Sequence, residues 1–457
     1  MLLLDDTIAA ISTAMGQGGI GIVRLSGPEA LPIARALFAP ADAIGWHQPT
    51  SHRFYYGHIV DPQSSQAVDE VLLAYMAAPH TYTRQDVIEI DAHGGGVSLR
   101  EILSLALRHG ARPAEPGEFT LRAFLNGRLD LAQAEAVQDV VLARTSAALH
   151  LALGQLDGRL SSQIRSLRSQ LVNVLAYLEA TIDFGEEDIP PQDIGPELAA
   201  VAGDLAALVQ EAERGQIYRQ GVRTAIIGRP NVGKSSLLNA LLRADRAIVT
   251  PLPGTTRDTL EETANVQGIP LVLVDTAGIN GASHDPIERL GIARSRRSLE
   301  TADLALFVVD GSVPPSPADA EVAALIAGPR VVMVVNKCDL PPGGDYGSLL
   351  PGVRRQAVSA LTGAGLAELE MALAEIILAG RAGSDGDPLA SNPRHGEAFR
   401  RALAHVEDAR RAAARALPAD LTAIDVAAAV DALGEVTGET AGEDVLERIF
   451  ANFCIGK

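Results

Sequence analysis

Four segments of the chain differ in how apolar and polar residues follow one another. Over residues 1–120, short apolar runs such as IGIVRLSG, RFYYGHIV and DVIEIDAHGGG end at glycine-rich turns. Runs of this length, rich in β-branched and aromatic side chains and bounded by glycine, indicate strands. We therefore predict an N-terminal α+β domain over residues 1–120.

The second segment, residues 121–218, has a helical period. Leucine, isoleucine and valine recur every three or four positions from Leu149 to Leu178. This spacing places one continuous apolar stripe along a single long helix. Pro190 and Pro191 interrupt the pattern after an acidic patch. We predict the first half of an all-α helical domain here.

The third segment, residues 219–380, alternates strand-like and helical runs. TAIIG, PLVLVDTAG, LALFVVD and VVMVVNK are apolar along most of their length. Such runs are typical of parallel strands that helices cover on both faces, and they predict an α/β domain. A linker rich in Gly, Asp, Pro and Ser opens residues 381–457, where alanine-rich helical runs follow. We predict that the α/β domain is inserted into one helical domain, whose second half is residues 381–457.

Composition and charge narrow the function classes. Hydrophobic residues make up 47% of the 457 residues and charged residues 21%, which excludes global disorder. The net charge of −19 argues against nucleic-acid binding through the whole surface, so an RNA contact would need a local basic face or a partner. Only two cysteines occur, which excludes a disulfide framework. With no apolar run of about 18–20 residues and no basic region at the N-terminus, we expect a cytoplasmic protein without a membrane segment.

A phosphate-binding loop is predicted at residues 228–236. GRPNVGKS, from Gly228 to Ser235, matches the pattern G-x-x-x-x-G-K-[ST] and lies between the strand-like TAII and the helical SLLNALL. Gly228 and Gly233 let backbone N–H groups turn toward phosphates. Lys234 can reach the β- and γ-phosphates, and Ser235 can ligate Mg²⁺.

Two later motifs suit the magnesium and the γ-phosphate. Thr255 and Thr256 follow the helical run, where a hydroxyl can complete the Mg²⁺ shell. Asp275, at the start of DTAG, can hold the magnesium through water, and Gly278 can offer its N–H to the γ-phosphate.

Two further motifs indicate that the base is guanine. Asp339, in the run NKCD from Asn336, can accept hydrogen bonds from guanine N1–H and the 2-amino group, which adenine does not offer. A backbone N–H of residues 359–361 could donate to guanine O6. Together the ordered motifs predict GTP rather than ATP.

The group that activates water is less evident. Ras-like enzymes use a glutamine directly after the DTAG-type motif, but this chain has Ile279, which cannot orient water. Glu288 is a candidate general base acting through a bridging water; a solvated acid near a helix start is the alternative. No arginine finger is evident. The amide oxygen of Asn231 could hold a monovalent cation near the phosphates, although asparagine is also common in turns.

The nucleotide motifs, TPLPGTTRD and the C-terminal FCIGK together resemble the MnmE (TrmE) family of tRNA modification GTPases. GIGIVRLSG, GEFTLRAFLNGRLDLAQAEAV and LGEVTGE extend the resemblance over essentially the whole chain. It implies that a flavin-dependent partner, MnmG (GidA), and this protein form a heterotetramer-type complex that modifies carbon 5 of the wobble uridine of certain tRNAs. A tetrahydrofolate derivative of the 5-formyl or methylene type would bind the N-terminal domain and supply the one-carbon unit. The resemblance also implies a homodimer whose GTPase domains meet across the nucleotide with K⁺ bound, which stimulates hydrolysis.

The resemblance assigns roles residue by residue. It implies a potassium site at Asn231, Thr250, Leu252 and Thr255, magnesium ligands at Ser235 and Thr256, and a catalytic role for Glu288. From the phosphate-loop motif we also expect a catalytic role for Lys234, which would stabilise the charge that develops on the phosphates. It implies a folate site at Arg24, Glu89, Arg128 and Lys457. The expected GTP-binding residues are Asn231, Val232, Gly233, Lys234, Ser235, Ser236, Thr250, Pro251, Leu252, Pro253, Gly254, Thr255, Thr256, Asp275, Thr276, Ala277, Gly278, Asn336, Lys337, Asp339, Ser359, Ala360 and Leu361.

Some positions depart from the family pattern. The family often reads Y-T-G-E-D where this chain has Arg84 and Gln85 within residues 82–86, and Arg128 stands where a lysine is also found. These departures leave the detail of the folate contacts open. Cys454 could take part in one-carbon chemistry, but a free cysteine is more often a small buried apolar residue.

A second class of function stays open at this stage. GTP-dependent ribosome-assembly or RNA-binding switches share the TT and DTAG motifs but carry out no covalent chemistry. They usually append a basic RNA module with a G-x-x-G loop, whereas the G-x-x-G matches that follow the α/β domain here fall in the linker. Folate binding discriminates the two readings.

Overall fold

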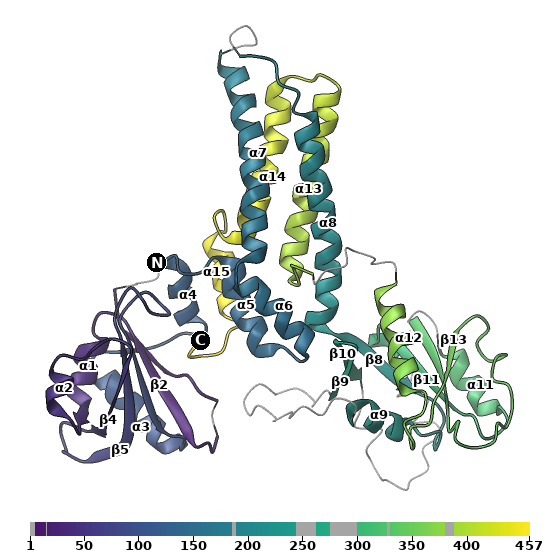
Figure 1. Ribbon diagram of the computed structural model, residues 1–457, viewed down its shortest axis with the longest axis horizontal. Helices are drawn as coiled ribbons and strands as arrows, with labels where there is room; N and C mark the ends of the chain where they lie inside the picture. The colour runs from purple at the N-terminus through teal and green to yellow at the C-terminus, as the bar shows by residue number, and fades with distance from the viewer. Residues whose placement is uncertain are drawn as a thin grey trace.

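The computed structural model describes residues 5–14, 16–184, 189–243, 262–274, 299–326, 330–379 and 388–457. An N-terminal sheet unit and a second α/β unit both lie near one end of a long helical bundle (Figure 1). The predicted multidomain class is confirmed: an α+β unit, a helical unit and an inserted α/β unit.

The N-terminal unit is built on one mixed sheet. Its seven described strands have the order β3-β4-β5-β6-β2-β1-β7, antiparallel except for the parallel pair β1 and β7. Alternate strand residues such as Val23 and Ile90 pack against Ile33 and Ile102 of the helices on one face. The elements are β1 (Ile8–Ile11), β2 (Ile20–Ser26), α1 (Ala30–Leu37), β3 (Phe38–Pro40), α2 (Ala43–His47), β4 (Arg53–Val60), β5 (Ala67–Met76), β6 (Val87–His93), α3 (Gly96–Arg108) and β7 (Arg112–Pro113).

Helices from before and after the inserted unit share one core. Leu171 and Leu205 on the N-terminal side pack in the same apolar cluster as Val406 and Leu433 on the C-terminal side. Figure 1 shows α7, α8, α13 and α14 side by side as the bundle. The helices are α4 (Glu118–Leu125), α5 (Leu131–Leu142), α6 (Ser146–Leu156), α7 (Arg159–Phe184), α8 (Gly195–Gln220), α13 (Pro393–Ala414), α14 (Ala419–Thr437) and α15 (Glu443–Phe450).

The single long helix predicted from the apolar stripe is wrong. The stripe runs over two helices, α6 and α7, because Gly158 adopts a φ of +82° between them. This left-handed conformation is one that glycine tolerates and that ends a helix. Gln133 Nε2 of α5 donates to Leu156 O at 2.9 Å, which satisfies a carbonyl at the end of α6. The buried residues of α6 are Ala148, Leu151, Ala152 and Gln155 rather than the stripe residue Leu153, which is 39% exposed, so the sequence spacing alone does not reveal the break.

The inserted unit has a mostly parallel sheet. Its described strands have the order β13-β12-β11-β8-β10-β9, and only β9 runs antiparallel to its neighbour. The carboxyl ends of β8, β11 and β12 therefore meet at one edge, which is where α/β sheets bind ligands. The elements are β8 (Val222–Ile227), α9 (Lys234–Arg243), β9 (Glu262–Val266), β10 (Ile269–Val274), β11 (Leu304–Asp310), α11 (Pro317–Ala324), β12 (Arg330–Asn336), β13 (Arg354–Ala357) and α12 (Leu366–Leu378).

The chain returns to the bundle beside the point where it leaves. A Cβ atom added to Gly215 of α8 would lie 1.8 Å from Ala390 O, so the returning backbone presses against this helix. Leu389 N–H donates to Glu211 of α8 at 3.3 Å, and Gln155 Nε2 of α6 donates to Leu389 O at 2.9 Å. The re-entry segment, residues 389–391, is thus fixed between α6 and the last turns of α8.

The inserted unit also contacts the helical unit through its β9–β10 hairpin. Thr145 Oγ1, at the N-terminus of α6, donates to Gly268 O at 2.8 Å, and Arg144 Nη1 lies 3.3 Å from Thr263 Oγ1. No helix in the described ranges is both long and apolar enough to cross a membrane.

Candidate functional site

The phosphate loop needs glycine at both ends. Gly228 has a φ of +153°, and a Cβ there would lie 2.3 Å from Val308 O of the neighbouring strand. Gly233 has a φ of +96°, and its Cβ would lie 2.2 Å from Asn336 Nδ2. The loop therefore passes so close to β11 and to the end of β12 that no larger residue fits at either position.

Lys234 lies at the start of α9 with its ammonium folded back over the loop. Lys234 Nζ donates to Gly228 O and to Arg229 O, each at 2.8 Å. Burial lowers the pKa of Lys234, because the charged form is poorly solvated there. A phosphate at the N-terminus of α9 would supply the missing counter-charge. Asn231, which is exposed, has a φ of +63° in the same loop.

Asn336 connects the phosphate loop to the loop after β13. Its amide is buried, with Nδ2 donating to Val232 O at 2.8 Å and Oδ1 accepting from Ala360 N–H at 3.0 Å. Lys337, at a φ of +65°, forms an ion pair of 2.5 Å with Asp310 at the end of β11. Three of the sequence motifs thus meet at one edge of the sheet.

The residues predicted to read guanine are partly accessible. Asp339 is exposed just beyond β12, so its carboxylate is accessible. Ser359 N–H donates a hydrogen bond to Ala364 O, and Ala360 N–H donates one to Asn336 Oδ1. Leu361 is 87% exposed. Its N–H is therefore the best-placed candidate donor to guanine O6 among residues 359–361.

The remaining predicted nucleotide residues lie outside the described residues. They belong to two segments, 244–261 and 275–298. The residues concerned are Thr250, Pro251, Leu252, Pro253, Gly254, Thr255, Thr256, Asp275, Thr276, Ala277, Gly278 and Glu288.

A second cluster forms where the C-terminus meets the N-terminal sheet. Arg24 of β2 and Glu89 of β6 are cross-strand neighbours, and Arg24 Nη2 lies 2.6 Å from Glu89 Oε1. Arg24 Nη1 also donates to Gly456 O at 3.2 Å. A Cβ on Gly456 would lie 2.7 Å from Ile11 O, so the tail lies flat against β1. Lys457 follows directly, which brings three of the four predicted folate residues together.

The fourth, Arg128, is joined to this cluster through aromatic rings. Its guanidinium lies 4.8 Å from the centre of the Tyr82 ring and donates to Tyr82 O at 3.2 Å. Tyr82 packs against the apolar group that contains Phe119, and Arg24 lies 5.6 Å from the centre of the Phe119 ring. Burial raises the pKa of Tyr82, whereas the Thr120 hydrogen bond and the charges of Arg128 and Arg24 act in the opposite direction.

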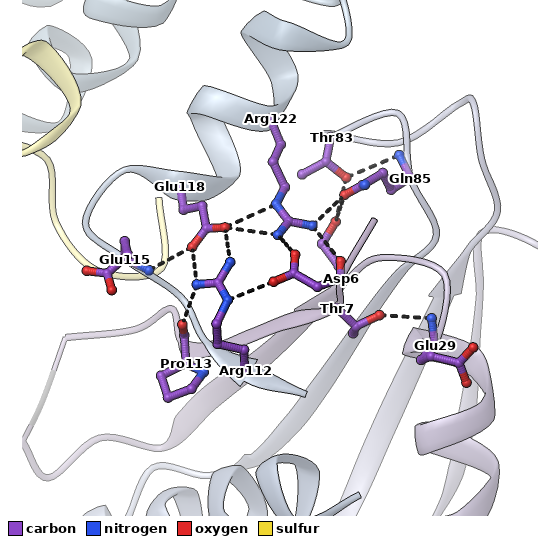
Figure 2. Close-up of polar contacts among 11 residues, drawn as sticks. Asp6, Thr7, Glu29, Thr83, Gln85, Arg112, Pro113, Glu115, Glu118 and Arg122 are labelled. Atoms are coloured by element: carbon purple, nitrogen blue, oxygen red, sulfur yellow. Dashed lines mark hydrogen bonds and ion pairs between the residues drawn. The ribbon is translucent and has the colours of Figure 1, made fainter. Parts of the chain in front are cut away.

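The loop that carries Tyr82 is connected through Gln85 to an ionic network around Arg122, which Figure 2 shows. Arg122, 1% exposed, binds Asp6 at 2.5 Å and Glu118 at 2.9 Å. Its Nη1 donates to Gln85 Oε1 at 3.1 Å. Burial opposes ionisation of Glu118, but hydrogen bonds from Arg112 and Arg122 outweigh it and lower the pKa of Glu118. Gln85 stands where the family often has glutamate. It accepts a hydrogen bond from Arg122, whose charge is already neutralised by Asp6 and Glu118.

Sequence reasoning missed Asp91, two residues after Glu89 on the same face of β6. Its Oδ1 atom is buried without a hydrogen-bond partner among the described residues. Burial and the nearby charge of Glu89 raise the pKa of Asp91. The strand period of two places residues 89 and 91 together and could have identified it.

Cys454 does not fit the expectation of a buried apolar cysteine. It is exposed, and its carbonyl accepts from Gly117 N–H at 3.3 Å. The tail is therefore fixed through its backbone and through Phe450 and Phe453, which are buried against Leu121 and Leu131.

Comparisons with known proteins cover almost the whole chain. A family model described as the MnmE helical domain matches residues 131–454, and one described as the GTP-binding protein TrmE N-terminus matches residues 7–128. The tRNA modification GTPase MnmE of Roseiflexus castenholzii is 50% identical, covering 100% of both chains. The proteins of that name from Chloroflexus aurantiacus and Geobacillus thermodenitrificans are 48% and 47% identical, each over 99% of this chain and 100% and 99% of their own. Among solved structures, Era in complex with MgGDPNP and 16S ribosomal RNA aligns with 40% of this chain and 66% of its own at 26% identity, with a TM-score of 0.26, an overlap too small to add to the argument.

Proposed function

Since this chain belongs to the MnmE family of tRNA modification GTPases, we propose that it hydrolyses GTP at residues 228–236 and couples hydrolysis to the modification of carbon 5 of the wobble uridine. The observation that carries the nucleotide site is the bridge made by Asn336. One buried amide holds the phosphate loop and the base-reading loop in a fixed relation, as a nucleotide spanning both requires.

The residues of the loop suit phosphoryl transfer. Lys234 is a half-buried cation that would stabilise charge on the β- and γ-phosphates. Ser235 and Thr256 would hold Mg²⁺, while Asn231, Thr250, Leu252 and Thr255 would hold K⁺; both ions would neutralise charge that develops in the transition state. Glu288 would orient the attacking water through a bridging water.

The cluster at the N-terminal sheet fits a tetrahydrofolate derivative. Glu89 and Asp91 offer carboxyl groups for an aminopyrimidinone edge, and Asp91 has a buried oxygen that lacks a protein partner among the described residues. Arg24, Arg128 and Lys457 would bind the carboxylates and the carbonyl. We propose that this site supplies a one-carbon unit in a complex with MnmG, and that two copies of this chain form a homodimer.

Potassium-dependent turnover tests the GTPase part. GTP hydrolysis should be faster in potassium than in sodium, and Asn231→Ala should remove the difference. Glu288→Ala should lower kcat by a factor on the order of 10² while GTP binding persists. Equal rates of the wild-type protein in both salts would refute the cation site.

Calorimetry with 5-formyltetrahydrofolate tests the modification part. The wild-type protein should bind it, and Arg24→Ala should weaken binding and reduce the wobble-uridine modification of cellular tRNA. Absence of binding, together with unchanged modification in Arg24→Ala cells, would leave a GTP-dependent RNA switch as the better description.

A further inference from the structure

A cavity of about 410 Å³ lies beside Arg128 and has a positively charged lining. His52, His80, Arg84 and Arg128 all line it, and no carboxylate is among its described lining residues. Arg84 Nη1 donates to Asn126 O at 2.9 Å, and Arg128 Nη1 donates to Tyr82 O at 3.2 Å. These contacts position both guanidinium groups without neutralising them.

Three other arginines of the same unit are arranged differently. Arg24, Arg112 and Arg122 each form an ion pair with a carboxylate at 2.9 Å or less. Within the described chain, neither Arg84 nor Arg128 has a carboxylate partner of this kind. The cavity therefore presents positive charge that the protein leaves available to an anionic ligand.

The backbone at Arg84 strengthens this point. Arg84 has a φ of +60°, a conformation that glycine adopts freely and an arginine adopts only at a cost. The cost is accepted at an exposed position where the side chain contributes a charge to the cavity and one hydrogen bond to a carbonyl. This arrangement indicates a functional role for the guanidinium group of Arg84.

The cavity shares Arg128 with the proposed folate site. Arg128 lines the cavity and stacks over Tyr82, while Tyr82 packs against the group that contains Phe119 beneath Arg24. A ligand held between Arg24 and Arg128 would thus have its far end at the mouth of the cavity.

We propose that this cavity binds the γ-linked glutamate tail of polyglutamylated folates. The proposal rests on the proposed function, because it extends the folate site by one subsite. Each added glutamate contributes a carboxylate, and guanidinium groups bind carboxylates through two parallel hydrogen bonds. The cavity would then select folates that carry several glutamates over those that carry one.

The test compares 5-formyltetrahydrofolate carrying one glutamate with the form carrying three, by calorimetry on the full-length protein. The wild-type protein should bind the triglutamate more tightly by on the order of tenfold, since its two added carboxylates can form two solvent-accessible ion pairs. Arg84→Gln should bring the two affinities within about twofold. Arg84→Gly, which suits the positive φ, should do the same and guards against a folding defect. Arg100→Gln, which removes an exposed arginine from α3, should keep the wild-type ratio.

Each other outcome overturns the proposal in a distinguishable way. Equal affinities for the two ligands in the wild-type protein would refute the tail subsite and leave the folate site intact. No binding of either ligand would refute both. A lower affinity for tRNA in Arg84→Gln, with an unchanged ratio of folate affinities, would assign the cavity to RNA phosphates instead.

Discussion

Asn336 shows how much of the nucleotide site depends on a single side chain. Its amide donates a hydrogen bond to Val232 O in one loop and accepts a hydrogen bond from Ala360 N–H in another. These two partners are 128 residues apart in the sequence. A carboxylate has the same shape but no donor. The neighbouring Asp339 is exposed and does not connect the two loops in this way. The two positions therefore separate the stability of the site from the base recognition that we propose for Asp339.

Asn336→Asp should destabilise the inserted unit and abolish GTP binding. The change places a buried charge against Val232 O and removes one hydrogen bond, a loss on the order of 2 kcal/mol. Thermal unfolding followed by circular dichroism would measure it. Asp339→Asn is the matched variant: it should weaken GTP binding with little change in unfolding temperature. Equal stability of both variants would contradict the bridging role of Asn336.

At the scale of elements, α8 is the helix on which the returning chain rests. Its two interior glycines differ sharply in their surroundings. Gly215 lies against the backbone of Ala390 and Ser391, whereas a Cβ on Gly203 would meet nothing within 4 Å. Because both lie within α8, their helical propensities are comparable. Gly203 therefore serves as a control for the free-energy cost of adding a Cβ atom at Gly215, where the returning backbone lies close.

Gly215→Ala should destabilise the helical unit, and Gly203→Ala should not. The first change forces a methyl group to within 1.8 Å of Ala390 O, and overpacking of this kind costs about 1–3 kcal/mol. The second replaces an exposed helical glycine and should gain up to about 1 kcal/mol. Chemical denaturation monitored by helical circular dichroism would rank them. If Gly215→Ala stabilised the protein, residues 389–391 would have to shift away from α8 at little cost, which would contradict this prediction.

The elements also show what the sequence could and could not predict. The phosphate loop is contiguous, so its spacing alone specified a strand, a loop and a helix, and the structure has β8 and α9 there. The break at Gly158 was missed because the leucines continue at helical spacing across it, although Leu153 of α6 is exposed and Leu160 of α7 is buried. The contact between Arg24 and Gly456 joins residues 432 apart and follows from packing rather than periodicity. The ion pairs of Arg122 were missed for the same reason.

At the scale of the whole molecule, a buried ion cluster joins the two halves of the helical unit. Glu135 of α5 binds Arg394 of α13 at 2.6 Å and His395 at 2.7 Å, across 259 and 260 residues of sequence. Nearby, Asp139 of α5 binds Arg219 of α8 at 2.7 Å, three residues before β8 begins. Both chain connections to the inserted unit are thus anchored on α5.

Glu135 should make the helical unit sensitive to acid. Burial would raise the pKa of Glu135, but the charges and hydrogen bonds of His395 and Arg394 outweigh it and lower this pKa to about 2. Because the pKa is depressed in the folded state, the stabilisation is complete above about pH 4.5 and is lost as the pH falls toward about 2, by on the order of 3 kcal/mol. Unfolding free energies measured across this range would follow the loss.

The matched variants are Glu135→Gln and Glu397→Gln. The first should be less stable at neutral pH and should lose less stability on acidification. The second removes an exposed carboxylate paired with Arg400 on α13 and should behave like the wild-type protein. An acid response of Glu135→Gln identical to that of the wild type would place the acid sensitivity elsewhere, for example in the network of Glu118 and Arg122.

The close contact between Ala390 and Gly215 suggests how the α/β unit came to be inserted into the helical unit. The α/β unit leaves from the end of α8 and its return segment lies against the last turns of the same helix. A helical protein could therefore have acquired a complete GTPase gene segment at this one corner without losing a helix or a core residue, since insertions succeed where the two ends of a segment are close together. The helical unit and the N-terminal unit would then form the framework into which the GTPase unit was inserted.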